Sequence, residues 1–306
     1  MKALSGEKLE IYLADVDPHV PGLSSLEGDR QPLIPRRGRD SWTELVYSFC
    51  ERHRIDVLIP TVDCELLLLA SARVFFADIG TKIVLASEKT LRMCLDKWAL
   101  HRHCKGAVRV PDSTLADEAF DPSRPELPVI VKPRMSARSH RIQLIERRED
   151  LERIDRDGSL IVQEYLPGVG YSLDILARSD GQVITVVPWE RSKVGSGIVA
   201  TGSTARDERL EAIGRRIAER IGLTSVASIQ VKEAFDGEPA LLEVNPCFGG
   251  TIPLTVASGV NMPKFCVDEA LDLPLPEDIA PIEQLAMTRD LQIDSAAEGV
   301  RWLSPP

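Results

Sequence analysis

Apolar and polar positions in the first third of the chain alternate between short strand-like runs and helical stripes. They predict strands at about 9–14, 56–60 and 81–86 and helices at about 41–54 and 63–78. Strands that alternate with helices are typical of a parallel α/β sheet. A helical segment at about 88–103 follows, and Pro122, Pro125 and Pro128 then mark a boundary.

The pattern changes to an antiparallel α+β lobe after this boundary. Strands are expected at about 128–133, 142–145, 159–166 and 171–176, with a charged helix at about 148–156. A second helix is expected at about 207–221, because its apolar residues fall on one helical stripe. The segment Gln284 to Gln292 is expected to add a last strand.

A β-hairpin is predicted around the turn signal Asp236-Gly237. Mirroring the chain about this turn pairs Gln230 with Glu243 and places Asn245 two residues further along the same side. The opposite, apolar side of this pairing consists of Ile229 and Val231 facing Val244 and Leu242. Hard oxygen ligands of this kind suit Mg²⁺, which usually keeps waters and takes its remaining ligands from phosphates. A solvated hairpin face is the alternative interpretation.

Composition and charge narrow the class of partner. With 306 residues and 43% hydrophobic composition, the chain can bury a large core and is expected to form two or three lobes. A net charge of −10 disfavours binding to nucleic acid, so a small-molecule ligand is expected. Apolar runs such as 66–70 fall far short of the roughly 20 residues that cross a bilayer, and the N-terminus lacks a signal-sequence pattern.

The cysteines and histidines predict neither a disulfide framework nor a zinc site. Six scattered cysteines contain no CxxC pair, which favours reduced thiols and a cytoplasmic location. His101, His103 and Cys104 lie close in sequence, but positions i and i+2 point to different sides of a helix, so a surface helix is expected.

Five motifs, in their order and spacing, resemble the ATP-grasp superfamily, in the branch of the carbamoyl-phosphate synthase large subunit and carboxylate–amine ligases. They are DKW, VIVKP, IVQEYLPG, SIQV and LLEVNPCFGG. The segment 55–70, together with Ile11 to Asp15, resembles the pre-ATP-grasp domain of these enzymes.

The resemblance implies a mixed α/β and α+β chain, an ATP-grasp fold preceded by a shortened Rossmann-like pre-ATP-grasp domain. The implied divisions are this domain at 1–87, a helical connection at 88–127, a small ATP-grasp lobe at 128–190 and a C-terminal lobe with the magnesium site at 191–306.

The resemblance also assigns roles to individual residues. The residues implied to bind ATP, at its phosphates or in the adenine hinge, are Lys97, Lys132, Ser139, Glu164, Tyr165 and Leu166. The catalytic residues implied beside the transferred phosphate are Arg191 and Lys193. The implied ligands of Mg²⁺ are Gln230, Glu243 and Asn245.

Four departures separate the chain from the family pattern. The loop at 134–141 contains no glycine, although the family uses glycines there so that backbone N–H groups can cradle phosphates. Gly170 replaces a ribose-binding glutamate, and Cys247 replaces an arginine that stabilises phosphoryl charge. The N-terminal domain is short by one strand, so a homodimer or a partner subunit is expected to cover the exposed edge.

These features predict an ATP-dependent ligase that activates a small-molecule carboxylate as an acyl phosphate and joins it to an amine. The alternative is a degenerate ATP-grasp protein that binds nucleotide or a partner without turnover. Retention of all three magnesium ligands favours the ligase. The sequence does not reveal the carboxylate or the amine, because variable loops build those pockets.

Overall fold

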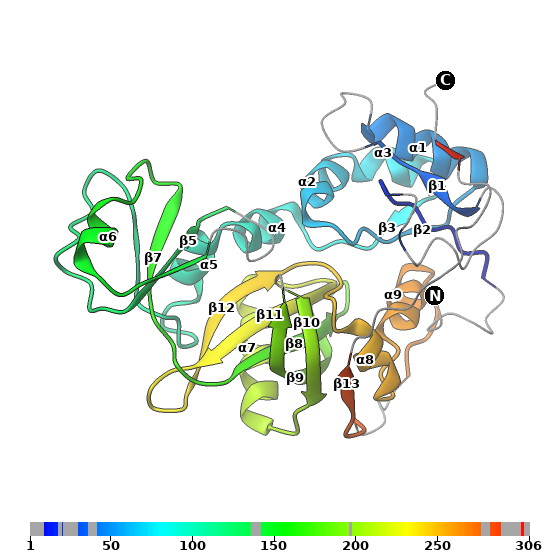
Figure 1. Cartoon of the computed structure of the whole chain (residues 1–306). Coiled ribbons are helices and arrows are strands. Elements are labelled where there is room, and N and C mark those ends of the chain that lie inside the picture. Colours follow the sequence, from blue (N-terminus) through cyan, green and yellow to red (C-terminus); the bar gives the residue numbers. More distant parts are fainter. Residues whose placement is uncertain are drawn as a thin grey trace.

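The computed structural model describes residues 9–17, 20, 30–35, 42–135, 142–195, 198–276, 282–288 and 301–302. Figure 1 shows a group of helices with short strands at one end, a small sheet at the other end, and a larger sheet between them. Among the described residues, no helix combines the length and the apolar character needed to cross a membrane.

The N-terminal unit contains α1 (Trp42–His53), α2 (Asp63–Ser71), α3 (Arg73–Asp78) and the strands β2 (Val57–Leu58) and β3 (Lys82–Ile83). β2 and β3 pair in parallel, which confirms the predicted α/β alternation. The strand expected at 9–14 is wrong, because this segment makes single backbone contacts with 30–34 rather than a continuous ladder. A short parallel pair joins β1 (Pro32–Leu33) to β14 (Arg301–Trp302).

The helical connection is divided into α4 (Glu88–Leu95) and α5 (Lys97–Cys104). Asp96 separates them because its backbone is extended, with φ −106° and ψ 100°. Its carboxylate accepts hydrogen bonds from the backbone N–H groups of Trp98 and Ala99, which caps α5. The break therefore lies inside the DKW motif.

The small sheet is antiparallel and has the order β4-β7-β5-β6. Its strands are β4 (Ser113–Leu115), β7 (Leu160–Glu164), β5 (Val129–Pro133) and β6 (Gln143–Ile145), and α6 (Arg148–Glu152) packs beside it. β4 was not among the strands predicted from the sequence. The strands of this sheet lie within residues 113–164.

The large sheet is antiparallel and has the order β12-β11-β8-β9-β10-β13. Its strands are β12 (Pro239–Asn245), β11 (Val226–Glu233), β8 (Gly170–Ala177), β9 (Val183–Gly195), β10 (Ile198–Thr204) and β13 (Ala286–Thr288). β13 bears out the last strand expected after Gln284. α7 (Glu208–Ile221) packs on one face, where its buried stripe meets Leu173 and Ile175. The helices α8 (Ile252–Ala257) and α9 (Met262–Ala270) follow β12.

The predicted hairpin between β11 and β12 is present, and its central register is confirmed. Gln230 pairs with Glu243, and Ser228 pairs with Asn245. The two-residue turn is wrong, because the ladder ends at Glu233 and a longer loop closes with a hydrogen bond from Ala234 N to the Glu238 carbonyl of 3.0 Å. The partner expected for Val231 is also wrong: it pairs with Leu241, and Leu242 is the extra residue of a β-bulge.

Candidate functional site

The polar face of the large sheet carries the three predicted magnesium ligands. Gln230 and Glu243 are paired across β11 and β12, and Asn245 lies two residues beyond Glu243 on the same side of the strand. Asn245 Nδ2 donates to Glu243 Oε1 at 3.3 Å. The structure therefore brings together the residues that the hairpin pattern predicted.

Three cationic side chains from different elements surround the Glu243 carboxylate. Lys97 Nζ of α5 lies 3.7 Å from Glu243 Oε2. Arg191 of β9 donates through Nη1 to Gln230 Oε1. Burial lowers the pKa of Lys132 on β5 to about 8, and Glu243 opposes this shift. A carboxylate with more cations than anions around it leaves room for a polyanion.

These cationic side chains are largely buried. Lys97 and Lys132 are each 5% exposed. The Nε of Arg191 is buried and has no hydrogen-bond partner among the described residues. Burial lowers the pKa of Arg191, while Glu243 raises it. Because buried charges are costly without partners, an anionic ligand at this point would stabilise the cluster.

The chemistry of the donor set fits Mg²⁺. One carboxylate and two amide side chains offer hard oxygen atoms on a single face. The described part of the chain, this face included, holds no group of three or more His, Cys, Asp or Glu residues that could bind a metal ion. A magnesium ion at this face would therefore take further ligands from waters or phosphate oxygens.

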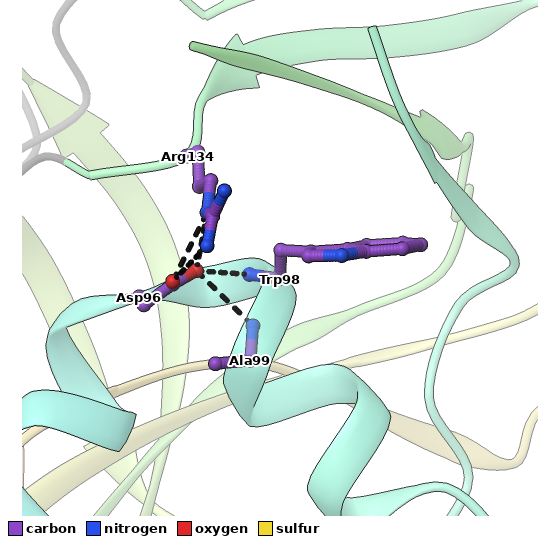
Figure 2. A network of polar contacts seen from close by, with 4 residues as sticks. All are labelled: Asp96, Trp98, Ala99 and Arg134. Atoms are coloured by element: carbon purple, nitrogen blue, oxygen red, sulfur yellow. Dashed lines mark hydrogen bonds and ion pairs between the residues drawn. The ribbon is translucent and has the colours of Figure 1, made fainter. Parts of the chain in front are cut away.

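An ion pair joins the α4–α5 break to the end of β5 (Figure 2). Arg134 donates through Nε to both Asp96 oxygens, at 2.9 and 3.0 Å, and through Nη2 to Oδ2 at 2.6 Å. The backbone N–H of Lys97 also donates to the Arg134 carbonyl at 3.1 Å. This Asp96–Arg134 clamp fixes Lys97 relative to Lys132, which lies two residues before Arg134.

The predicted adenine hinge begins at the last residue of β7, and its side chains contact other parts of the chain. Glu164 Oε2 accepts from the backbone N–H of Asp112 at 3.0 Å. The Lys232 ammonium lies 5.4 Å from the ring centroid of Tyr165, and Leu166 is buried. Gln163, next to the hinge, was not among the residues singled out from the sequence; it is 3% exposed, and its Oε1 has no partner within the described ranges. Ile161 is the register partner of Lys132, and Gln163 lies two residues after Ile161 on β7. Because side chains alternate along a strand, Gln163 lies on the same face of the sheet as Lys132, and this spacing in the sequence could have pointed to it.

The departures from the family pattern have distinct surroundings. Nothing lies within 4 Å of the position that a Cβ on Gly170 would take, and Lys232 is its register partner on β11. Burial, followed by the charges of Asp63 and Glu65, raises the pKa of Cys247 to about 12, so this thiol stays protonated. Ser139 lies outside the described residues, as does the glycine-free loop from 136 to 141. Lys193 is described only through its backbone, which pairs with Thr201 in β10.

A buried carboxylate holds the segment that follows Asn245. Asp174 on β8 is fully buried and accepts from Thr251 Oγ1 at 2.8 Å, Thr255 Oγ1 at 2.6 Å and Trp189 Nε1 at 3.0 Å. A Cβ on Gly249 would lie 2.7 Å from Ser228 Cβ, so only glycine permits this approach. The chain after the predicted magnesium ligands is therefore fixed to the sheet.

The expectation of a surface helix at 97–104 is wrong for two of the three residues considered. His101 and Cys104 are buried, whereas His103 is partly exposed. α5 packs between the two sheets, so the face that carries His101 meets β12 and β4. All six cysteines are free thiols.

Two family models match the chain. A model described as ATP-grasp in the biosynthetic pathway with Ter operon matches residues 156–292. A model of a PylC-like N-terminal domain matches residues 1–84. Among curated proteins, the D-alanine–D-alanine ligase of Thermotoga maritima is 34% identical over 94 residues, which are 29% of this chain and 31% of that enzyme.

Solved structures share the fold at low sequence identity. Biotin carboxylase from Campylobacter jejuni, in a β,γ-ATP complex, has a TM-score of 0.69 at 17% identity and covers 81% of this chain and 62% of its own. N5-carboxyaminoimidazole synthase from Aspergillus clavatus, with ADP and 5-aminoimidazole ribonucleotide, has a TM-score of 0.68 at 14% identity, over 90% of this chain and 73% of that one. L-amino acid ligase from Bacillus licheniformis has a TM-score of 0.66 at 15% identity, and the match covers 90% of this chain and 79% of that one. The chain thus spans less than two thirds of the biotin carboxylase and about a third of the curated ligase.

Proposed function

We propose that this chain is an ATP-dependent carboxylate–amine ligase of the ATP-grasp superfamily, because an ATP-grasp model matches residues 156–292 and a PylC-like N-terminal domain model matches residues 1–84. The γ-phosphate of ATP passes to a carboxylate oxygen of a small molecule, which gives an acyl phosphate and ADP. An amine then attacks the acyl carbon, phosphate leaves with the electrons of the broken C–O bond, and the amine loses a proton. The products are an amide, ADP and phosphate.

The observation that carries this proposal is the cluster of Lys97, Lys132 and Arg191 around Glu243. We assign Lys97 and Lys132 to the phosphates of ATP, because compact ammonium groups act on phosphates as point charges. Arg191, with its unpartnered Nε, is assigned to the transferred phosphoryl group, together with Lys193.

Gln230, Glu243 and Asn245 are proposed to hold Mg²⁺ with ATP. When bound, the ion would neutralise charge that develops on the phosphates. Gln230 already accepts from Arg191, so the amide would orient the guanidinium as well as offer an oxygen atom. The protein contributes mainly position and electrostatics, as phosphoryl transfer requires.

The base of ATP is proposed to lie against the hinge formed by Glu164, Tyr165 and Leu166. The Glu164 carboxylate already accepts a hydrogen bond from the backbone of Asp112, so the hinge would contact the base through backbone groups. Gln163 supports this placement, because its buried and unpartnered amide oxygen could accept from an exocyclic amino group such as that of adenine.

The amine and carboxylate substrates are proposed to be small molecules, as for the synthase and the ligase whose folds this chain shares. A homodimer or partner subunit over the N-terminal unit and a cytoplasmic location stay predictions. The non-catalytic alternative is favoured by one feature, the buried and protonated Cys247, which offers no charge where the family has an arginine.

Calorimetric titration with a non-hydrolysable ATP analogue tests the nucleotide site. We expect binding that requires Mg²⁺ in the wild type and is lost in Glu243→Ala. Glu238→Ala is the matched control, since this glutamate is exposed in the loop of the same hairpin. The ligase activity is then tested with ATP, Mg²⁺, hydroxylamine and a panel of carboxylic acids. Nucleotide binding without any acyl hydroxamate across the panel would favour the non-catalytic alternative. Absence of binding by a folded sample would refute the ligase and leave only a partner-binding form of that alternative.

A further inference from the structure

His101 lies where three elements of the candidate site meet. It belongs to α5, four residues after Lys97, and only 3% of it is exposed. Its Nε2 lies 3.0 Å from the Leu242 carbonyl oxygen of β12, and its Nδ1 lies 3.4 Å from Ser113 Oγ of β4. The buried imidazole therefore contacts both sheets, and no step of the proposed reaction uses it.

The surroundings of His101 determine where its ring proton lies. Burial, together with the charge of Lys132 and then that of Lys97, lowers the pKa of His101 to about 4 against the opposing contact with Leu242. The ring is therefore neutral near pH 7 and carries one proton. A carbonyl oxygen can only accept, so this proton lies on Nε2 and is donated to Leu242. The Ser113 hydroxyl donates to the Pro111 carbonyl at 3.0 Å.

Leu242 is the residue that the β-bulge leaves without a register partner. Gln230 pairs with Glu243, and the next residue of β11 pairs with Leu241. A bulge changes the direction of neighbouring side chains, so the way in which it is held affects the aim of Glu243. His101 and Lys97 lie on one face of α5 and contact the consecutive residues Leu242 and Glu243.

We propose that His101 is a positioning residue that aims the Glu243 carboxylate at the magnesium and phosphate site by holding the Leu242 carbonyl. The inference rests on the proposed function and assigns to it a residue outside the family motifs. A neutral donor suits this task, because Lys97, Lys132 and Arg191 already surround Glu243 and a fourth cation would compete for the carboxylate.

The test measures how much Mg²⁺ is needed for half-maximal binding of a non-hydrolysable ATP analogue. We expect His101→Leu to raise this concentration about tenfold, because loss of the donor leaves a buried carbonyl unsatisfied and lets the bulge relax. His101→Gln, whose amide N–H can reach the same carbonyl, should stay within about twofold of the wild type. As in the wild type, neither variant should bind the analogue without Mg²⁺.

His103→Leu is the matched control. The Nε2 of His103 also lies 2.8 Å from a backbone carbonyl, that of Arg220, but on the partly exposed side of α5. It should leave the requirement for Mg²⁺ unchanged. A His101→Leu protein that melts at a lower temperature but keeps the wild-type requirement would show a purely structural role and overturn the proposal.

A measurement on the wild type keeps the proposal testable if His101→Leu does not fold. The ¹⁵N chemical shifts of the His101 ring should show a protonated Nε2 at pH 7 and no titration down to pH 5. A proton on Nδ1 would exclude donation to Leu242 and overturn the proposal. If the wild type shows no magnesium-dependent binding at all while the ring has the expected tautomer, the proposed function fails and the positioning role falls with it.

Discussion

The Asp96–Arg134 clamp allows a quantitative prediction about the junction between α5 and the small sheet. Arg134→Gln removes the bidentate ion pair, and Asp96→Asn removes its charge while keeping an oxygen that can cap Trp98 and Ala99. Asp96→Ala removes both the ion pair and the cap. The three variants therefore separate the two roles of one carboxylate.

The magnitude follows from the burial of the pair. The Asp96 side chain is 13% exposed and that of Arg134 is 34% exposed. Exposed ion pairs contribute about 0.2–1 kcal/mol, whereas hydrogen bonds to charged groups contribute about 1.5–3 kcal/mol. We expect Arg134→Gln and Asp96→Asn each to lower the free energy of unfolding by about 1–2 kcal/mol. Asp96→Ala should lower it by about 1 kcal/mol more, because the cap is also lost.

The pH dependence of this contribution has a defined sign. Burial alone would raise the pKa of Asp96, but the hydrogen bonds from Arg134 and from the Ala99 and Trp98 backbone lower it overall. A carboxyl group whose pKa is lower in the folded state stabilises the protein above its unfolded pKa, and this contribution is lost as the pH falls through the folded value. The Arg134→Gln effect should therefore be full at pH 7 and smaller at about pH 3.

Urea unfolding of the two single variants and of the double variant Asp96→Asn/Arg134→Gln measures the coupling energy. We expect a coupling of about 1 kcal/mol, since the two residues contact each other directly. Arg92→Gln is the control, because the Glu88–Arg92 pair on α4 is 44% and 65% exposed and should contribute under about 0.5 kcal/mol. A coupling energy indistinguishable from zero would show that the Asp96–Arg134 ion pair does not stabilise the junction between α5 and the small sheet, and would refute the reasoning.

Three further predictions concern other parts of the site. The pKa of Lys132 is lowered to about 8, so affinity for the ATP analogue should fall as the pH rises above about 8. The Lys132→Arg variant keeps its charge in this range, so its affinity should depend less on pH, even if it binds more weakly. Calorimetric titrations from about pH 7 to about pH 9.5 measure this difference. Burial, followed by the charges of Asp15 and Asp63, raises the pKa of Glu65 to about 7. The stability that this group contributes is present below its unfolded pKa and is lost as the pH rises through about 7. In urea unfolding, Glu65→Gln should therefore be more stable than the wild type at about pH 8, by about 1 kcal/mol after discounting for partial exposure. The two proteins should be equally stable near pH 4. Gly170→Glu should fold normally, because the space is open, and should increase the preference for ATP over its 2′- and 3′-deoxy analogues; equal affinities would place the ribose elsewhere.

The sequence by itself determined the features that depend on local periodicity. The alternation along β11 and β12 paired Gln230 with Glu243, because a slip of one residue would turn every apolar side chain to the wrong face. The helical stripe of α7 and the order of the motifs were likewise readable, since each depends on the spacing of residues close together in the chain. The ATP-grasp fold was indicated by the resemblance of the five motifs, in their order and spacing, to that superfamily.

Only the tertiary structure decided which side chains meet and how strands end. The bulge at Leu242 and the longer hairpin loop follow from contacts that β12 makes with α5 and with Arg109. The ion pair at the Asp96 break joins it to an arginine that lies 38 positions away in sequence. Burial of His101 depends on the packing of α5 between two sheets. Contacts of this kind involve partners distant in the chain, and no local pattern of hydrophobic and polar positions specifies a distant partner.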